Sequence, residues 1–311
     1  MRVAAIDIGT NSVLLLVAER QGDALSPVLE RATVTRLGEG VDRNRRLLDT
    51  ACERTLACLS NYAAELRRLG ITVLDAVGTS AMRDAEGGQA FVARAKEVLG
   101  VAPRTIDGNE EARLTFAGAL SGLRATGPVT VFDIGGGSTE IVVGLRDSTG
   151  RHITAAVSLN IGSVRLFERH VKSDPPSLAE LQLVERDIAT ALAAAPRPES
   201  TATLVGVAGT VTQLAALDLE LTRYDATRVH GYTLTQSSVA RLATQLASLT
   251  VAQRRAMPGM EPARADVLVV GSAIARAVLQ WSGATELVVS DRGVRWGLAE
   301  DLAARVAVSA S

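Results

Sequence analysis

Two acidic residues and a run of three glycines lie close together in the middle of the chain. Residues Val131 to Gly144 read VFDIGGGSTEIVVG, with Asp133 before the glycines and Glu140 after them. Both acids lie in apolar stretches typical of buried strands, where an unpaired charge is costly. Consecutive glycines allow φ > 0 and let backbone N–H groups converge on an anion. The pattern predicts a hairpin that holds a phosphate, with two carboxylates placed to bring in Mg²⁺. An ordinary glycine-rich hairpin with solvated acids is the alternative.

A second segment near the N-terminus repeats this arrangement. An apolar run from Val3 ends in Asp7 and is followed by Ile-Gly-Thr-Asn-Ser and a second apolar run from Val13 to Val17. Both segments contain Asp-Ile-Gly followed by small polar residues between strands, which indicates an internal duplication. We therefore expect two related half-structures, each offering a phosphate loop toward a shared cleft. This pairing resembles the arrangement of actin-like phosphotransferases.

Composition favours a two-domain enzyme or regulator of the reducing cytosol. The chain has 311 residues, 47% hydrophobic and 22% charged, with a net charge of -1 and only 3% aromatic residues. No basic field attracts nucleic acid, and few aromatics are available to stack on bases. Cys52 and Cys58 are spaced for different helix faces, which argues against a disulfide. We expect a cytoplasmic protein with no leader segment, no membrane span and no nucleic-acid partner.

Alternating strand and helix patterns predict an α/β fold. The expected elements include strands at 32–37, 152–159 and 286–289 and a helix at 236–248. Further polar residues lie where strands end. Arg83 follows a strand that we place at 71–77, and the adjacent acids Glu110 and Glu111 open a helix. Gly209 and Thr210 end another strand and begin a helix, which makes a third possible anion site. Each has an ordinary alternative: a surface arginine beside a capped helix, acids that favour a helix N-terminus, and a tight turn. We place the domains at 1–127 and 128–311, with the option that the last helix, about 293–308, packs back on the first domain.

These motifs together resemble the exopolyphosphatase / guanosine pentaphosphate phosphohydrolase (Ppx/GppA) family of bacteria. The resemblance covers essentially the whole chain. The matching stretches are Asp7–Ser12, Gly78–Arg83, Gly108–Arg113, Asp133–Glu140, Gly209–Thr210 and Ser290–Gly293. The resemblance implies an α/β protein of two actin-like (ribonuclease H-like, ASKHA) domains with a cleft between them. It also implies hydrolysis of terminal phosphates with Mg²⁺ or Mn²⁺, pairing as a homodimer, and the short type without a helical C-terminal region.

The resemblance also implies a role for each candidate residue. Glu111 would orient and deprotonate the attacking water, and Arg83 would contact the chain of phosphates. Asp133 and Glu140 would hold the metal ion, and Asp7 would join them. The phosphate-binding residues would be Gly9, Thr10, Asn11, Ser12, Gly135, Gly136, Gly137, Ser138, Thr139, Gly209 and Thr210.

Three points stay open at this level. The residues do not separate inorganic polyphosphate from guanosine pentaphosphate as substrate. An ATP-dependent small-molecule kinase of the same fold would share the glycine loops. A non-catalytic sensor of polyphosphate or of the guanosine alarmone would use the same residues for binding alone.

Overall fold

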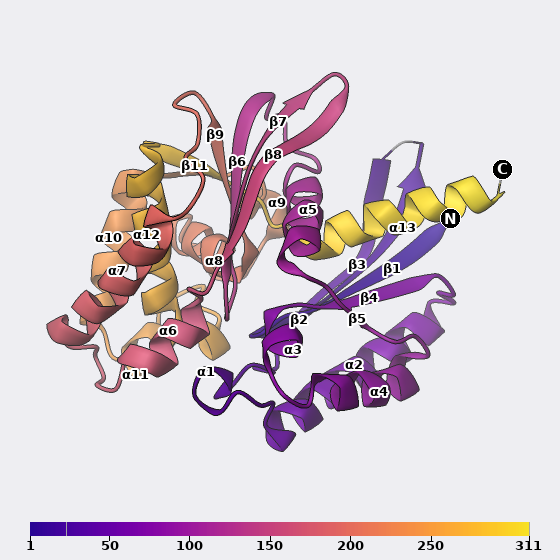
Figure 1. Ribbon diagram of the computed structural model, residues 1–311, viewed down its shortest axis with the longest axis horizontal. Coiled ribbons are helices and arrows are strands. Elements are labelled where there is room, and N and C mark those ends of the chain that lie inside the picture. The colour runs from indigo at the N-terminus through magenta and orange to yellow at the C-terminus, as the bar shows by residue number, and fades with distance from the viewer. Residues whose placement is uncertain (23, 311) are drawn as a thin grey trace. The chain divides into compact units, whose positions relative to one another are not determined.

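The computed structural model describes residues 1–22 and 24–310, and the chain divides into two compact units (Figure 1). Unit 1 comprises Met1–Gly118 and the C-terminal segment from Val294, and unit 2 comprises Ala119–Gly293. The sequence places the boundary at residue 127 instead. Residues just before it belong with unit 2 because Nη1 of Arg146 donates to the carbonyls of Leu120 at 2.8 Å and Leu123 at 2.7 Å.

Unit 1 is built on a five-stranded sheet in the order β3-β2-β1-β4-β5. The first three strands form an antiparallel meander, and β4 and β5 continue the sheet in parallel with β1. The strands are β1 (Arg2–Ile8), β2 (Ser12–Gln21), β3 (Ala24–Val34), β4 (Leu74–Gly78) and β5 (Arg104–Thr105). The helices are α1 (Val41–Asn44), α2 (Asp49–Arg68), α3 (Ser80–Asp84), α4 (Gly88–Leu99), α5 (Gly108–Ala119) and α13 (Val294–Ala310).

Helices cover both faces of this sheet, where successive side chains of each strand project alternately. Ala4, Ile6 and Ile8 of β1 share one apolar core with α2 and α4. Val3 and Ala5 point the other way and share a second core with α13 and with residues of α5. Figure 1 shows α13 on the opposite side of this sheet from α2 and α4. The odd-numbered side chains of β1 therefore face α5 and α13, and this alternation places Asp7 on the same face.

Unit 2 is built on a six-stranded sheet in the order β10-β11-β9-β6-β7-β8. Its strands are β6 (Gly127–Ile134), β7 (Thr139–Asp147), β8 (Gly150–Leu159), β9 (Thr203–Val207), β10 (Thr233–Thr235) and β11 (Glu286–Val289). Its helices are α6 (Ser163–His170), α7 (Leu178–Ala193), α8 (Ala208–Asp218), α9 (Ala226–Val229), α10 (Gln236–Ser248), α11 (Val251–Arg255), the 3₁₀ turn η1 (Pro262–Arg264) and α12 (Leu268–Ser282). Helix α12 is buried nearly all round because α6, α7, α8 and α10 pack against it.

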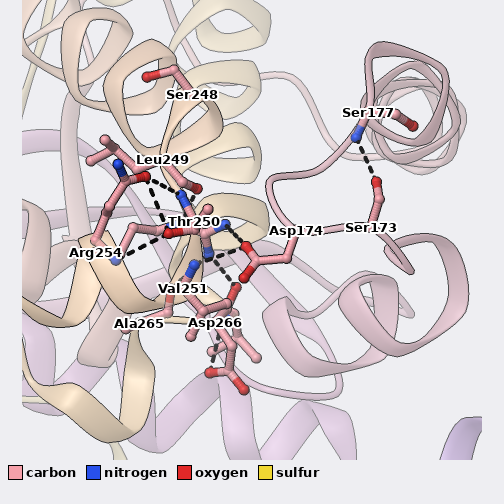
Figure 2. Close-up of polar contacts among 12 residues, drawn as sticks. Ser173, Asp174, Ser177, Ser248, Leu249, Thr250, Val251, Arg254, Ala265 and Asp266 are labelled. Atoms are coloured by element: carbon pink, nitrogen blue, oxygen red, sulfur yellow. Dashed lines mark hydrogen bonds and ion pairs between the residues drawn. The ribbon is translucent and has the colours of Figure 1, made fainter.

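A buried arginine joins three segments of unit 2 (Figure 2). Arg254 is fully buried, and it donates from Nε to the carbonyl of Leu249 at 3.1 Å and from Nη1 to that of Ala265 at 2.7 Å. The Asp174 carboxylate lies 3.8 Å from Nη2 and accepts the Val251 N–H at 2.8 Å. Burial lowers the pKa of the Arg254 guanidinium. The network fastens the loop after α6 to α11 and to the segment before α12.

The two units repeat one another in topology and in their first turn. In each, an antiparallel meander is extended by a strand parallel to its first member. The Gly9 N–H donates to the Ser12 carbonyl at 2.9 Å, and the Gly135 N–H donates to the Ser138 carbonyl at 3.0 Å. The turns therefore have equal length and the same closing bond. Within the described parts of the chain, no helix combines the length and apolar character needed to cross a bilayer.

Candidate active site

In unit 2, Asp133 and Glu140 lie directly opposite one another on the neighbouring strands β6 and β7. Opposite residues of an antiparallel pair project from the same face, with Cβ atoms about 5 Å apart. Glu140 is buried, and its Oε1 accepts a 2.7 Å hydrogen bond from Ser158 Oγ, which lies opposite it on β8. The ladder thus presents two carboxylates side by side and fixes the orientation of one.

The glycine turn of unit 2 has all three of its glycine carbonyls engaged by the start of α6. The Ser163 N–H donates to the Gly135 carbonyl at 3.0 Å, and the N–H groups of Val164 and Arg165 both donate to the Gly136 carbonyl at 3.0 Å. The Gly137 carbonyl accepts from Nε of Arg165 at 2.6 Å. In a trans peptide the N–H points opposite to the carbonyl. The amides that follow these three carbonyls therefore point away from α6.

This contact depends on a glycine and a buried guanidinium. A Cβ on Gly162 would lie 2.4 Å from the Gly136 carbonyl oxygen, so a larger residue would force α6 away from the turn. Arg165 is only 7% exposed, so its side chain is held inside the unit beside the turn.

The third predicted anion site of the chain lies in unit 2, after the strand next to the one that carries Asp133. Val207 ends β9 and lies beside Asp133 in the parallel ladder, so Gly209 and Thr210 begin α8 at the same edge of the sheet. Open α/β sheets bind ligands at this edge. Ala208 has φ 68°, a strained value for a residue with a side chain.

In unit 1, the turn from Gly9 to Ser12 is joined to α3. Thr10 Oγ1 and Ser80 Oγ share a 3.0 Å hydrogen bond, and the Thr79 N–H donates to the Ile8 carbonyl. Asn11 is 6% exposed, and neither Oδ1 nor Nδ2 of its carboxamide has a hydrogen-bond partner among the described residues. A buried amide without partners is costly, which suggests that a ligand completes its hydrogen bonds.

Arg83 and Glu111 form an ion pair within unit 1. Nη1 of Arg83 donates to Glu111 Oε2 at 3.0 Å and to the Ile106 carbonyl at 3.1 Å. The Glu111 side chain is 8% exposed, whereas that of Glu110 is 32% exposed and pairs with Arg104 at 2.9 Å. Of the two adjacent acids, only Glu111 is thus buried beside the predicted phosphate-binding arginine.

The two units differ in the number of acidic residues beside their turns. Asp7 is paired with Leu14 across β1 and β2, at the ladder position where Asp133 of unit 2 is paired with Glu140. Among the residues described, no group of three or more histidine, cysteine, aspartate or glutamate side chains is close enough to hold a metal ion. The Asp133–Glu140 pair fits Mg²⁺, which takes few carboxylates and keeps water and phosphate oxygens as its other ligands.

An antiparallel meander extended by parallel strands, present in two copies, defines an actin-like protein of two domains, and the predicted fold class is confirmed. The model of the Ppx/GppA phosphatase family matches residues 16–305, and the chain belongs to this family.

Relatives and solved structures agree with this assignment. The chain is 38% identical to exopolyphosphatase 2 of Mycobacterium tuberculosis, over 97% of this chain and 98% of that protein. An exopolyphosphatase-like protein of known structure has a TM-score of 0.93 at 34% identity, covering 98% of both chains. The Ppx/GppA family member of Aquifex aeolicus has a TM-score of 0.82 at 32% identity, again covering 98% of both chains.

Sequence reasoning missed the residues that support these groups. Ser158 and Arg165 are single polar residues outside the motifs, and Ser80 lies within the Gly78–Arg83 stretch without a predicted role of its own. Only Ser158 had a usable signal, because the predicted strand 152–159 follows the strand of Glu140 and can place a polar side chain beside that acid on one face of the sheet. The pairing of Arg83 with Glu111 joins residues on two separate helices and has no sequence signal.

Proposed function

We propose that this phosphatase hydrolyses the terminal phosphate of inorganic polyphosphate or of guanosine pentaphosphate, with Glu111 as general base. The observation that carries the proposal is the buried Glu111 carboxylate, fixed by Arg83 at 3.0 Å. A carboxylate held in one orientation can align a water molecule and accept its proton as the water attacks phosphorus. General-base catalysis of this kind contributes about 10²–10⁴-fold to the rate.

The remaining candidate residues bind the phosphates and stabilise charge. In this proposal the amides of each turn bind phosphate oxygens, because fixed donors stabilise the charge that spreads over these oxygens in the transition state. Arg83, whose side chain is 26% exposed, would contact the next phosphate while it holds Glu111. Asp133 and Glu140 hold Mg²⁺ or Mn²⁺, with Asp7 as a further acid, and the metal ion neutralises phosphate charge when bound.

The first experiment compares phosphate release from long polyphosphate, short polyphosphate and guanosine pentaphosphate in the presence of Mg²⁺. We expect Glu111→Gln to lower kcat about 10²–10⁴-fold. The matched control Glu110→Gln removes a charge one residue away and should keep nearly full activity. Chelation with EDTA should abolish release, and added Mg²⁺ should restore it.

Other outcomes would contradict the proposal in different ways. No release from any substrate, by a folded protein that binds them, would make the chain a sensor. Transfer of phosphate to an acceptor in place of water would make it a kinase. Equal loss in Glu111→Gln and Glu110→Gln would remove Glu111 as the base.

We also propose a homodimer in the cytoplasm. The resemblance to a family whose members pair supports the dimer, and two buried cysteines, both free thiols, support a reducing compartment. Light scattering at micromolar concentration tests the dimer, and a monomer mass would exclude it.

A further inference from the structure

Three arginines in one loop of unit 1 lack an acidic partner. Arg43, Arg45 and Arg46, which we call the arginine loop, are all exposed, and their side chains form no ion pair or hydrogen bond with any described residue. Several other exposed arginines of unit 1 have acidic partners. Examples are Arg31 with Glu65, Arg54 with Glu39 and Arg94 with Glu53.

The backbone before the arginine loop is hydrogen-bonded to the turn Gly9–Ser12 of unit 1, which is a predicted phosphate-binding turn. The N–H groups of Thr35 and Arg36 donate to the Asn11 carbonyl at 3.0 and 2.9 Å. The Gly38 N–H donates to the Thr10 carbonyl at 2.9 Å, and a Cβ on Gly38 would lie 2.3 Å from the Thr10 Cγ2 atom. The loop therefore leaves directly from the turn.

The other end of the arginine loop is bonded to the segment that follows α3. The Glu86 N–H donates to the Arg45 carbonyl at 2.8 Å, and the Leu47 N–H donates to the Glu86 carbonyl at 3.0 Å. Helix α3 carries Arg83 in its last turn. The arginine loop is thus fixed at its two ends to the two elements of unit 1 that carry predicted phosphate-binding residues.

The conformation of the loop holds an arginine where a glycine is usual. Arg45 caps the C-terminus of α1 with φ 56°, a left-handed conformation in which glycine or asparagine is preferred. A fixed backbone therefore carries the three guanidiniums. They form a local positive cluster in a chain whose net charge is only -1.

We propose that Arg43, Arg45 and Arg46 bind the distal phosphates of inorganic polyphosphate, so that long polyphosphate is the preferred substrate. This inference rests on the proposed function. When the end of a linear polyphosphate is held at the turn, the rest of the molecule must extend over the protein segments next to that turn. Each guanidinium can bind two phosphate oxygens at once. Guanosine pentaphosphate divides its phosphates between the 5′ and 3′ positions of one ribose and offers no extended row.

The experiment compares two triple variants of the full-length protein. One is Arg43→Ala/Arg45→Ala/Arg46→Ala. The matched control, Arg67→Ala/Arg68→Ala/Lys96→Ala, removes three exposed positive charges of unit 1 that also lack acidic partners. The readouts are KM for long polyphosphate, KM for tripolyphosphate, and the salt dependence of each.

We expect the arginine-loop variant to raise the ratio of KM for long polyphosphate to KM for tripolyphosphate about tenfold, since each exposed ion pair contributes a factor of about two. The slope of log KM against log salt for long polyphosphate should fall by about 0.7 per lost contact, if polyphosphate behaves as a single-stranded nucleic acid does. The control variant should keep the wild-type ratio. An unchanged ratio, or an equal change in both variants, would overturn the inference.

Binding in EDTA separates this inference from the proposed hydrolysis. If the wild-type protein releases no phosphate from any substrate, the proposed function fails, and filter binding of labelled long polyphosphate then tests the arginine loop alone. Binding about tenfold weaker in the arginine-loop variant than in the control would support the loop as a polyphosphate site. Equal binding would reject it.

Discussion

At the scale of single residues, Asn11 has the clearest unfavourable effect on the free energy of folding. Its polar atoms are buried without partners among the described residues, a state that destabilises a protein by about 1–3 kcal/mol. We therefore predict that Asn11→Leu, a replacement of similar size, leaves the free energy of unfolding unchanged or raises it by about 1 kcal/mol. The same change should raise KM for polyphosphate. Urea unfolding and steady-state kinetics check the two effects.

A stable variant with normal KM would show that Asn11 does not bind substrate. A variant destabilised by several kcal/mol would show that the carboxamide is needed for packing. The matched control is Asn61→Leu, which changes an exposed asparagine of α2 and should alter neither stability nor KM.

At the scale of elements, the start of α6 acts as the support of the glycine turn. Arg165→Met keeps a long apolar stem but removes the hydrogen bond to the Gly137 carbonyl. A hydrogen bond from a charged group contributes about 1.5–3 kcal/mol, so we predict a loss of about tenfold or more in kcat/KM. Phosphate release measures the effect, and near-UV circular dichroism verifies the fold.

Arg169 provides the control on the same helix. Its guanidinium pairs with Asp187 on the surface, 3.0 Å away, and lies farther along α6 from the turn. Arg169→Met should keep wild-type kcat/KM. If both variants lose activity equally, the loss reflects α6 as a whole and not the bond to the turn.

Elements were predicted well where they have a local signal. The predicted helix 236–248 and strand 286–289 coincide with α10 and β11. The third strand was wrong: we expected Ala32 to Leu37, whereas β3 spans Ala24–Val34. As an edge strand it buries no face completely and so lacks an alternating apolar pattern. The N–H groups of residues 35, 36 and 38 donate to carbonyls of the N-terminal turn instead.

At the scale of the whole molecule, the duplication was visible in the sequence because it repeats a motif, Asp-Ile-Gly. The Arg83–Glu111 ion pair could not be predicted because it depends on how α3 and α5 pack within unit 1. The end of the first unit was also hidden, since the bonds from Arg146 that tie residues 120–123 to β7 come from one side chain.

The pH dependence of unfolding is also a property of the whole molecule. Glu180 accepts hydrogen bonds from the backbone of Lys172 at 2.8 Å and of Ser177 at 2.8 Å, and from the Ser173 hydroxyl. These bonds lower its pKa from 4.5 to about 2. Because the folded pKa lies below the unfolded one, this stabilisation is present above pH 4.5 and is lost as the pH falls toward 2.

We therefore predict that Glu180→Gln destabilises the protein at neutral pH and that the difference from wild type shrinks as the pH falls below 4.5. Urea unfolding across this range measures it. Glu199→Gln, an exposed change in the loop after α7, should differ little from wild type at any pH. A constant difference between Glu180→Gln and wild type would rule out the carboxylate as the source.

The engagement of the three carbonyls of Gly135, Gly136 and Gly137 by α6 has a consequence for the entropy of binding. Three glycines in sequence are the most flexible stretch a chain can contain, and ordering them costs about 1–2 kcal/mol of backbone entropy per residue. In this protein that loss occurs when unit 2 folds. An incoming phosphate therefore meets an ordered turn, and little of its interaction energy is spent on ordering the backbone that receives it.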